Sequence, residues 1–266
     1  MLICGENEQA EAALLKMAAI NGKCLPSGKL TILSAELQKG SLFNMIKTNK
    51  RVFVLLNFIW IILTFVYYGI ALLTPEVILH GGLSFNTTSF ERHDQNTANN
   101  STVSSGYLVC MPLLTSDYVH LVWTTAAELP GIGICWFLVE KFSRRMLLFT
   151  FFMVYALSVL LLATDSFPTA FVYVLLFIAR GAINANFAVC ILYTLEVYPT
   201  TNRALAFGFH AGFGRFGAMI TPFIAQVLMK VEPKLAVGIY AVVSGLTALI
   251  TLALPRDTKD QELEDN

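Results

Sequence analysis

Apolar residues gather into six long stretches along the chain, with polar residues between them. A transmembrane helix needs roughly 20 mainly apolar residues. The stretches meet this requirement and predict transmembrane helices over 52–73, 118–139, 146–163, 168–192, 205–228 and 235–254. The first, third and sixth are uninterrupted, whereas the other three contain charges and glycines. The pattern therefore predicts an all-α membrane protein whose six helices form a bundle over 52–254.

The residues before the first stretch follow a different pattern. Apolar residues recur at helical spacing within 6–20, which predicts an amphipathic helix; they are Ala13, Leu14, Met17 and Ala18. Glycine and proline then interrupt the chain. We interpret 1–51 as an amphipathic linker segment and 255–266 as an acidic tail, both in the cytosol.

Composition supports the membrane assignment and argues against other classes. The chain is 56% hydrophobic and 14% charged, with a mean hydropathy of +0.64, whereas soluble domains are about 25% charged. Its 18 basic and 18 acidic residues cancel, so no basic surface for nucleic acid is indicated. The sequence contains no recognisable catalytic, phosphate-binding or metal-ligand motif. We therefore expect no enzyme activity, cofactor or metal.

Lysine and arginine predict the orientation, because they concentrate on the cytosolic side of membrane proteins. With six helices, both termini share one side, and thirteen basic residues fall there: Lys16, Lys23, Lys29, Lys39, Lys47, Lys50, Arg51, Lys141, Arg144, Arg145, Arg203, Arg256 and Lys259. The opposite side has three, namely Arg92, Lys230 and Lys234. Both termini are therefore predicted to be cytosolic.

The loop over 76–117 agrees with this orientation. It contains the three N-glycosylation sequons of the chain, at Asn86, Asn99 and Asn100. Such sequons can arise by chance in a loop rich in Asn and Thr. Their confinement to the loop that the charge count places outside favours glycosylation, with at most one glycan on the adjacent pair.

Three charged residues lie inside the predicted helices, where charge is costly and usually functional. Glu128, Arg180 and Arg215 fall near the middle of the second, fourth and fifth helices, a depth at which transporters bind substrates. Asn184 and Asn186 could offer hydrogen bonds to the same cavity. Alternatively, Glu128 forms a structural ion pair with one arginine. One carboxylate cannot neutralise both, so one arginine should lack an acidic partner and attract an anion.

Histidines and glycines are interpreted as structural. His120 and His210 are expected near helix ends, as interfacial polar residues rather than proton relays. The fifth helix is rich in glycine, and Gly208 and Gly212 form a GxxxG pattern that permits close helix packing.

Two turns on the predicted cytosolic side contain more specific patterns. The first contains Glu140, Arg144 and Arg145, and the second contains Glu196 and Arg203 with Pro199 between them. The first resembles the acidic-x-x-Gly-Arg-Arg loop of the major facilitator superfamily, with Ser143 at the glycine position. The second resembles a signature of the sugar and organic-ion branches of that superfamily.

The resemblance implies that the six helices correspond to helices 7 to 12, the C-terminal half of a twelve-helix transporter. It implies a secondary carrier that moves a small organic solute by alternating access, with the turn residues forming a cytosolic gate. It also implies a synaptic or other intracellular vesicle membrane. An arginine without an acidic partner suggests an anionic solute.

Half of such a transporter is missing from the chain, so a truncated or partial chain is expected. The alternative interpretation is a non-transporting membrane scaffold, or a regulatory half that pairs with a full-length relative. The expected partners are therefore the lipid bilayer, the solute, and one of three protein partners: an N-terminal half, a full-length relative or a second copy of the chain.

Overall fold

The computed structural model describes residues 7–22, 46–47, 50–80, 115–164 and 167–255, and every regular element among them is helical. The chain divides into two compact units, Met1–Lys39 and Gly40–Asn266. The first unit contains α1 (Asn7–Ile20), which confirms the helix expected over 6–20. The three sequons and nearly all of the predicted acidic tail lie outside the described residues.

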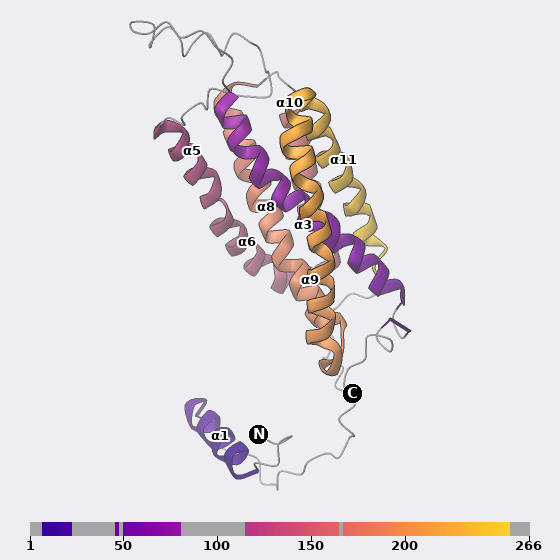
Figure 1. Cartoon of the computed structure of the whole chain (residues 1–266). Helices are drawn as coiled ribbons and strands as arrows, with labels where there is room; N and C mark the ends of the chain where they lie inside the picture. Colours follow the sequence, from indigo (N-terminus) through magenta and orange to yellow (C-terminus); the bar gives the residue numbers. More distant parts are fainter. Residues whose placement is uncertain (1–6, 23–45, 48–49, 81–114, 165–166, 256–266) are drawn as a thin grey trace, which may run out of the picture. The chain divides into compact units, whose positions relative to one another are not determined.

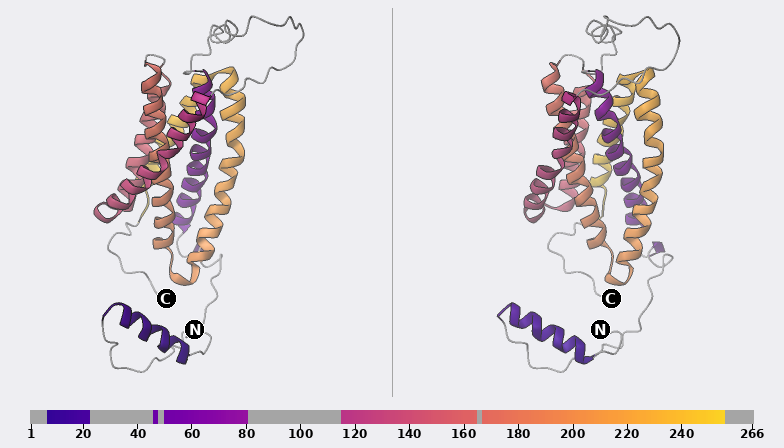
Figure 2. Two further views of the ribbon diagram at one scale, coloured as in Figure 1. Left: turned by 90° about the vertical axis from the view of Figure 1, so that its left-hand side faces the viewer. Right: turned by 60° about the vertical axis from the view of Figure 1, so that its left-hand side comes forward.

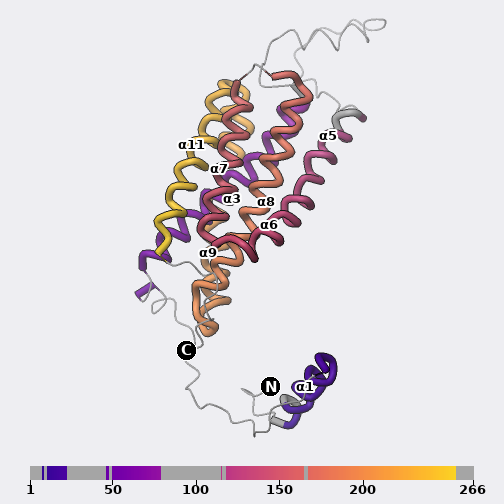
Figure 3. The backbone as a smooth tube through the Cα atoms, turned by 180° about the vertical axis from the view of Figure 1, so that it is seen from behind, coloured from indigo at the N-terminus to yellow at the C-terminus, as the bar shows by residue number. Residues whose placement is uncertain are grey.

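The second unit is a bundle of long helices (Figures 1 and 2). Its elements are α3 (Lys50–His80), α5 (Thr115–Ala126), α6 (Glu128–Lys141), α7 (Arg144–Leu162), α8 (Thr169–Val197), α9 (Thr200–Pro222), the π-helix η2 (Phe223–Leu228), α10 (Met229–Val231) and α11 (Pro233–Leu252). Helix α3 packs against α8, α9 and α11, and α7 packs against α8 and α11. Figure 3 shows α7 beside α8, with α6 on the other side of α8.

The predicted fold class is confirmed, although several boundaries differ; the fourth predicted helix, for example, ends at Val197 rather than at 192. Helix α3 continues seven residues beyond 73, because Val77 and Ile78 are buried and extend the apolar face beyond Pro75. The predicted helix over 118–139 consists of α5 and α6, which are separated at Ala127. The fifth predicted helix begins earlier, at Thr200, and its last six residues form η2.

Five of the described helical segments are long and apolar enough to cross a membrane: Lys50–Ile78, Tyr118–Lys141, Arg144–Leu162, Thr169–Val197 and Pro233–Leu252. The fifth predicted span, now α9, is long enough at 23 residues but is not among them. Its two arginines, one histidine and five glycines or alanines before Phe213 reduce its apolar character.

Hydrogen bonds of polar side chains connect neighbouring helices. In a lipid environment, backbone and side-chain polar groups must find partners within the protein. The Trp60 indole nitrogen donates to the Thr194 hydroxyl at 3.0 Å, joining α3 to α8. The Thr221 hydroxyl donates to the Phe65 carbonyl at 3.0 Å, joining α9 to α3. The Ser244 hydroxyl donates to the Phe152 carbonyl at 3.1 Å, joining α11 to α7.

Glycines bring α9 close to α3, but they are not the predicted ones. A Cβ atom at Gly217 would overlap the Ile61 carbonyl oxygen, and one at Gly214 would lie 3.3 Å from the Trp60 carbonyl oxygen. No atom outside the local backbone lies within 4 Å of a Cβ built at Gly208 or Gly212. The GxxxG pattern therefore faces away from α3, because helix packing depends on which side of α9 faces its neighbour.

Candidate functional site

A break between α5 and α6 positions the one acidic residue in the middle of the second predicted span. Pro130 has no backbone N–H, so the Ala126 carbonyl loses its helical partner. The chain turns at Ala127, and α6 begins at Glu128. A carboxylate in the first turn of a helix is stabilised by the helix dipole. The Pro130 break therefore places the Glu128 carboxylate where its negative charge is tolerated.

Glu128 pairs with Arg180 of α8. Both the Nε and the Nη2 atoms of Arg180 lie 3.1 Å from Glu128 Oε1. The side chains are 14% and 25% exposed for Arg180 and Glu128 respectively, so the pair is partly shielded. One turn along α8, the Asn184 amide donates to the Glu128 backbone carbonyl at 3.2 Å. Arg180 and Asn184 thus hold both the carboxylate and the backbone at the start of α6.

Two facing glycines allow this approach of α6 to α8. A Cβ atom at Gly131 would lie 2.5 Å from the Gly181 carbonyl oxygen, and one at Gly181 would lie 3.1 Å from the Ala127 carbonyl oxygen. Larger residues at these positions would separate the helices. The Glu128–Arg180 pair therefore depends on small residues elsewhere along the same interface.

Arg215 of α9 has a different environment. Its Nη1 atom donates to the Tyr68 hydroxyl at 2.9 Å, and its side chain is exposed. Within the part of the chain that the structure describes, Arg215 has no acidic partner. Glu128 is paired with Arg180, so Arg215 is the one of these two arginines that has no carboxylate partner among the described residues.

Two adjacent tyrosines of α3 lie between these charged groups. Tyr67 contacts Tyr68 edge-on, with ring centroids 5.5 Å apart, and lies close enough to Glu128 and Arg180 to interact electrostatically with both. Tyr68 bonds to Arg215. Neither residue was predicted from the sequence. Two adjacent tyrosines, with polar hydroxyl groups, in an otherwise apolar helix could have indicated them.

Asn186 does not join this group. Its side chain is completely buried, and neither the Nδ2 nor the Oδ1 atom has a hydrogen-bond partner. Successive α-helical residues are about 100° apart, so Asn184 and Asn186 point to nearly opposite sides of α8. The structure therefore brings Asn184, but not Asn186, to the Glu128–Arg180 pair.

The turn residues assemble in part at the other end of the bundle. Arg144 forms a two-pronged ion pair with Glu196, with Nε–Oε2 and Nη2–Oε1 distances of 3.0 and 2.9 Å. Arg145 donates to the Leu252 carbonyl of α11. Glu140 is exposed at the end of α6. Arg203 has buried Nε and Nη2 atoms without a hydrogen-bond partner.

Ser143 fits the turn without the conformational freedom of glycine. Its φ angle is −68°, which any residue adopts, and its hydroxyl accepts a hydrogen bond from the Met146 backbone N–H as the N-cap of α7. Serine is a favoured N-cap residue. The departure from the family pattern therefore leaves the turn intact.

His210 lies in the interior rather than near a helix end. It is fully buried within α9. Its Nε2 lies 3.0 Å from the Tyr198 hydroxyl, and its Nδ1 lies 3.0 Å from Asn57 Oδ1. Asn57 uses its amide nitrogen for the Phe53 carbonyl, so its oxygen must accept from Nδ1–H. His210 thus links α3 to the α8–α9 junction. His120, by contrast, stacks on Tyr173.

The family comparison matches this architecture. The model of the Major Facilitator Superfamily matches residues 121–266, more than half of the chain. The chain belongs to the Major Facilitator Superfamily. Among proteins of this superfamily, the synaptic vesicle 2-related protein of Rattus norvegicus is 34% identical over 266 residues, which is 100% of this chain and 46% of that protein.

Other relatives give the same picture. The "Putative transporter svop-1" of Caenorhabditis elegans is 35% identical, covering 98% of this chain and 48% of that protein. The "Putative transporter SVOPL" of Homo sapiens is 30% identical, covering 98% of this chain and 52% of that protein. The chain spans about half the length of the curated relatives it matches, and the matched part is their C-terminal half. Two of these three relatives are named as putative transporters.

Proposed function

We propose that this chain forms the C-terminal half of a secondary carrier that moves a small organic anion by alternating access. The observation that supports this proposal best is the state of Arg215, which is exposed and bonded to Tyr68 but has no acidic partner among the described residues. A charge kept in a membrane-spanning bundle is usually functional. A guanidinium group is well suited to bind a carboxylate through two hydrogen bonds.

In this proposal, the two charged centres have different roles. Arg215 and the Tyr68 hydroxyl bind the anionic group of the solute. The Glu128–Arg180 pair is internally neutral, so it positions α6 against α8 without competing for the anion. Tyr67 lies between the two centres. It contacts the Tyr68 ring and interacts electrostatically with Glu128 and Arg180.

The turn residues would act as the gate. The Arg144–Glu196 pair ties the start of α7 to the end of α8, with side chains that are 15% and 17% exposed. A partly solvated pair gives only modest net stabilisation, which suits a contact that must break when the cytosolic side opens. Arg203, whose buried nitrogen atoms lack partners in this conformation, would gain an acidic partner in another.

A carrier of this kind needs a second half, since family members bind substrates between two related halves. Large apolar side chains are exposed along α6 and α9, including Leu129 at 76%, Trp136 at 74% and Met219 at 68%. We propose that an N-terminal half, a full-length relative or a second copy covers part of these faces. Both termini would lie in the cytosol, in a vesicle membrane by analogy with the named relatives.

A ligand-stabilisation experiment tests anion binding by Arg215. Benzoate should raise the unfolding temperature of the purified chain, because a ligand that binds only the folded state stabilises it. Benzamide, its neutral analogue, should not. Arg215→Gln should abolish the benzoate effect, and Lys230→Gln, which removes an exposed cation at another position, should retain it. If carboxylates from a wide panel raise the unfolding temperature no more than their amides do, and do so equally in both variants, an anion site at Arg215 is excluded.

A second candidate function is that of a non-transporting half, which pairs with and regulates a full-length relative through the exposed apolar faces of α6 and α9. Crosslinking in native membranes, followed by uptake measurements on the isolated complex, separates the two functions. If this chain is crosslinked to a relative, and Arg215→Gln in this chain leaves solute uptake by the complex unchanged, the regulatory function is favoured over the carrier function.

A further inference from the structure

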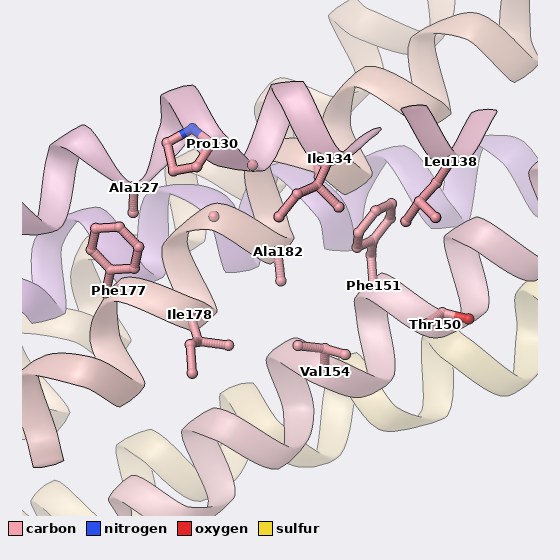
Figure 4. A pocket seen from close by; sticks show the side chains of 13 residues that line it. Ala127, Pro130, Ile134, Leu138, Thr150, Phe151, Val154, Phe177, Ile178 and Ala182 are labelled. Carbon is pink, nitrogen blue, oxygen red and sulfur yellow. The ribbon is translucent and has the colours of Figure 1, made fainter. Parts of the chain in front are cut away.

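The bundle carries an apolar groove that the proposed carrier function does not use. Its volume is about 350 Å³, and α6, α7 and α8 line it. Figure 4 shows Ile134 and Leu138 on one wall, Phe151 and Val154 on the other, and Ala182 on the floor. Thr150 is the one lining residue with a polar side chain, and its hydroxyl is engaged by the Met146 carbonyl at 2.8 Å. The groove therefore favours a hydrocarbon occupant.

The groove opens away from the charged centres. Ile178 lines the groove, and Arg180 lies two residues further along α8. Two helical residues correspond to a rotation of about 200°, so Arg180 points away from Ile178, and neither Arg180 nor Glu128 is among the residues that line the groove. Ile134 and Ile178 are 55% and 42% exposed. The groove is thus an open channel on the outer surface of membrane-spanning helices, where the surrounding medium is lipid.

Small residues form the floor and set the width of the groove. Ala182 and Ala185 of α8 leave space that larger side chains would fill, and Gly181 beside them lets α6 approach closely. Ala182 is almost completely covered, at 7% exposure, and its methyl group points into the groove (Figure 4). In lipid, small residues promote association because they allow close van der Waals contact. An unbranched acyl chain has the shape to exploit this floor.

Basic residues follow the Leu138 end of the groove, at the turn between α6 and α7. The wall residues Pro130, Ile134 and Leu138 recur every four residues, and Lys141 follows one turn after Leu138 on the same face of α6. The Lys141 ammonium lies 4.0 Å from the centre of the Phe137 ring. The N-terminus of α7 begins three residues later, and helix N-termini attract phosphate.

The charges around the α6–α7 turn favour an anion. Three cations lie there, Lys141, Arg144 and Arg145, against two carboxylates, Glu140 and Glu196, giving a net charge of +1. Glu196 is held by Arg144, so its charge is already compensated. The exposed Glu140 is the one carboxylate at the turn that opposes an anion.

We propose that the groove is a binding site for an acidic phospholipid, with one acyl chain between α6 and α7 and the phosphate at Lys141 and the start of α7. The hydrocarbon walls select the chain, and the basic end selects the headgroup. This site does not depend on the proposed transport function, because it involves neither Arg215 nor the Glu128–Arg180 pair.

Native mass spectrometry of the full chain tests the proposal. The chain is reconstituted with phosphatidylserine or with phosphatidylcholine of identical acyl chains, and the lipids retained after gentle detergent removal are counted. We expect one retained phosphatidylserine and roughly fivefold less retained phosphatidylcholine. Lys141→Gln should remove this preference, whereas Lys230→Gln, a control at an exposed lysine of α10, should preserve it.

Groove-filling variants test the acyl-chain site. Ala182→Leu should lower phosphatidylserine retention roughly fivefold, while Ala170→Leu, the same change at an exposed position of α8, should not. Val154→Phe on the opposite wall, with Val174→Phe as its exposed control, provides a second test if Ala182→Leu does not fold. Equal retention by the groove variants and their controls, equal binding of the two lipids, or a second copy of the chain in place of lipid would each overturn the proposal.

Discussion

At the scale of single residues, most of the polar groups discussed above have a hydrogen-bond or ion-pair partner, and a few buried ones have none. Glu128 and Glu196 each meet an arginine, and His210 has a partner at each ring nitrogen. Asn186, Asn202 and Arg203 contain buried polar atoms without partners. A buried polar atom without a partner costs about 1–3 kcal/mol. We interpret this cost as a sign that another conformation of the protein gives these three residues partners.

Asn186→Leu tests this interpretation directly. The variant should unfold at the same or a higher temperature than the wild type, with a gain of up to about 1–3 kcal/mol, because it removes two buried atoms without partners. Thermal unfolding of the purified chain measures this. A large loss of stability would mean that the asparagine amide has partners in the folded protein, and that its role is structural.

The Arg144–Glu196 pair should be coupled. Arg144→Gln or Glu196→Gln alone leaves a partly buried charge without its partner, so each should lower the free energy of unfolding by about 1–3 kcal/mol. The double variant should lose less than the sum of the two. A double-mutant cycle of SDS-induced unfolding gives the coupling. Strict additivity would show that the two side chains act independently.

At the scale of elements, close helix approach is controlled by individual glycines. Gly131 and Gly133 lie on the same helix, two residues apart, and differ completely in their surroundings. A Cβ atom at Gly131 would meet the Gly181 carbonyl at 2.5 Å, whereas a Cβ atom at Gly133 would meet nothing within 4 Å. The same chemical change should therefore have opposite effects at the two positions.

Gly131→Ala should destabilise the bundle by about 1–3 kcal/mol, because the added methyl group forces α6 away from the α8 backbone. Gly133→Ala should stabilise it by up to about 1 kcal/mol through its higher helix propensity. Unfolding of the two variants side by side makes the comparison. Similar effects at both positions would contradict the packing of α6 on α8 described here.

At the scale of the whole molecule, the orientation in the membrane remains a prediction from charge and sequons. Treatment of the expressed protein with a glycosidase should increase its electrophoretic mobility. The shift should disappear when Asn86, Asn99 and Asn100 are all changed to Gln, because the loop that contains them is predicted to face the lumen or the outside. Cleavage of this loop in intact cells by a protease confined to the cytosol would show that the loop faces the cytosol, opposite to the predicted orientation.

Much of this architecture could be predicted from sequence, since long apolar stretches show where helices cross a membrane. The positions of Glu128, Arg180 and Arg215 along their helices followed from the sequence, and their depth in the membrane stays a prediction. Which arginine meets Glu128 did not follow, because this depends on how each helix is rotated about its axis. The same reason explains why Gly208 and Gly212 were expected to pack and Gly214 and Gly217 do so instead.

The low apolar character of α9 has a consequence for biosynthesis. A nascent helix enters the bilayer from the translocon by itself only when its summed transfer free energy is favourable, and arginine near the centre opposes this by about 2.5–3.5 kcal/mol. Helix α9 contains Arg215 and is not among the sufficiently apolar segments. Only Tyr198 and Pro199 separate it from α8. We therefore expect α9 to insert during translation as a hairpin with α8, and to be translocated rather than inserted when a reporter carries α9 alone.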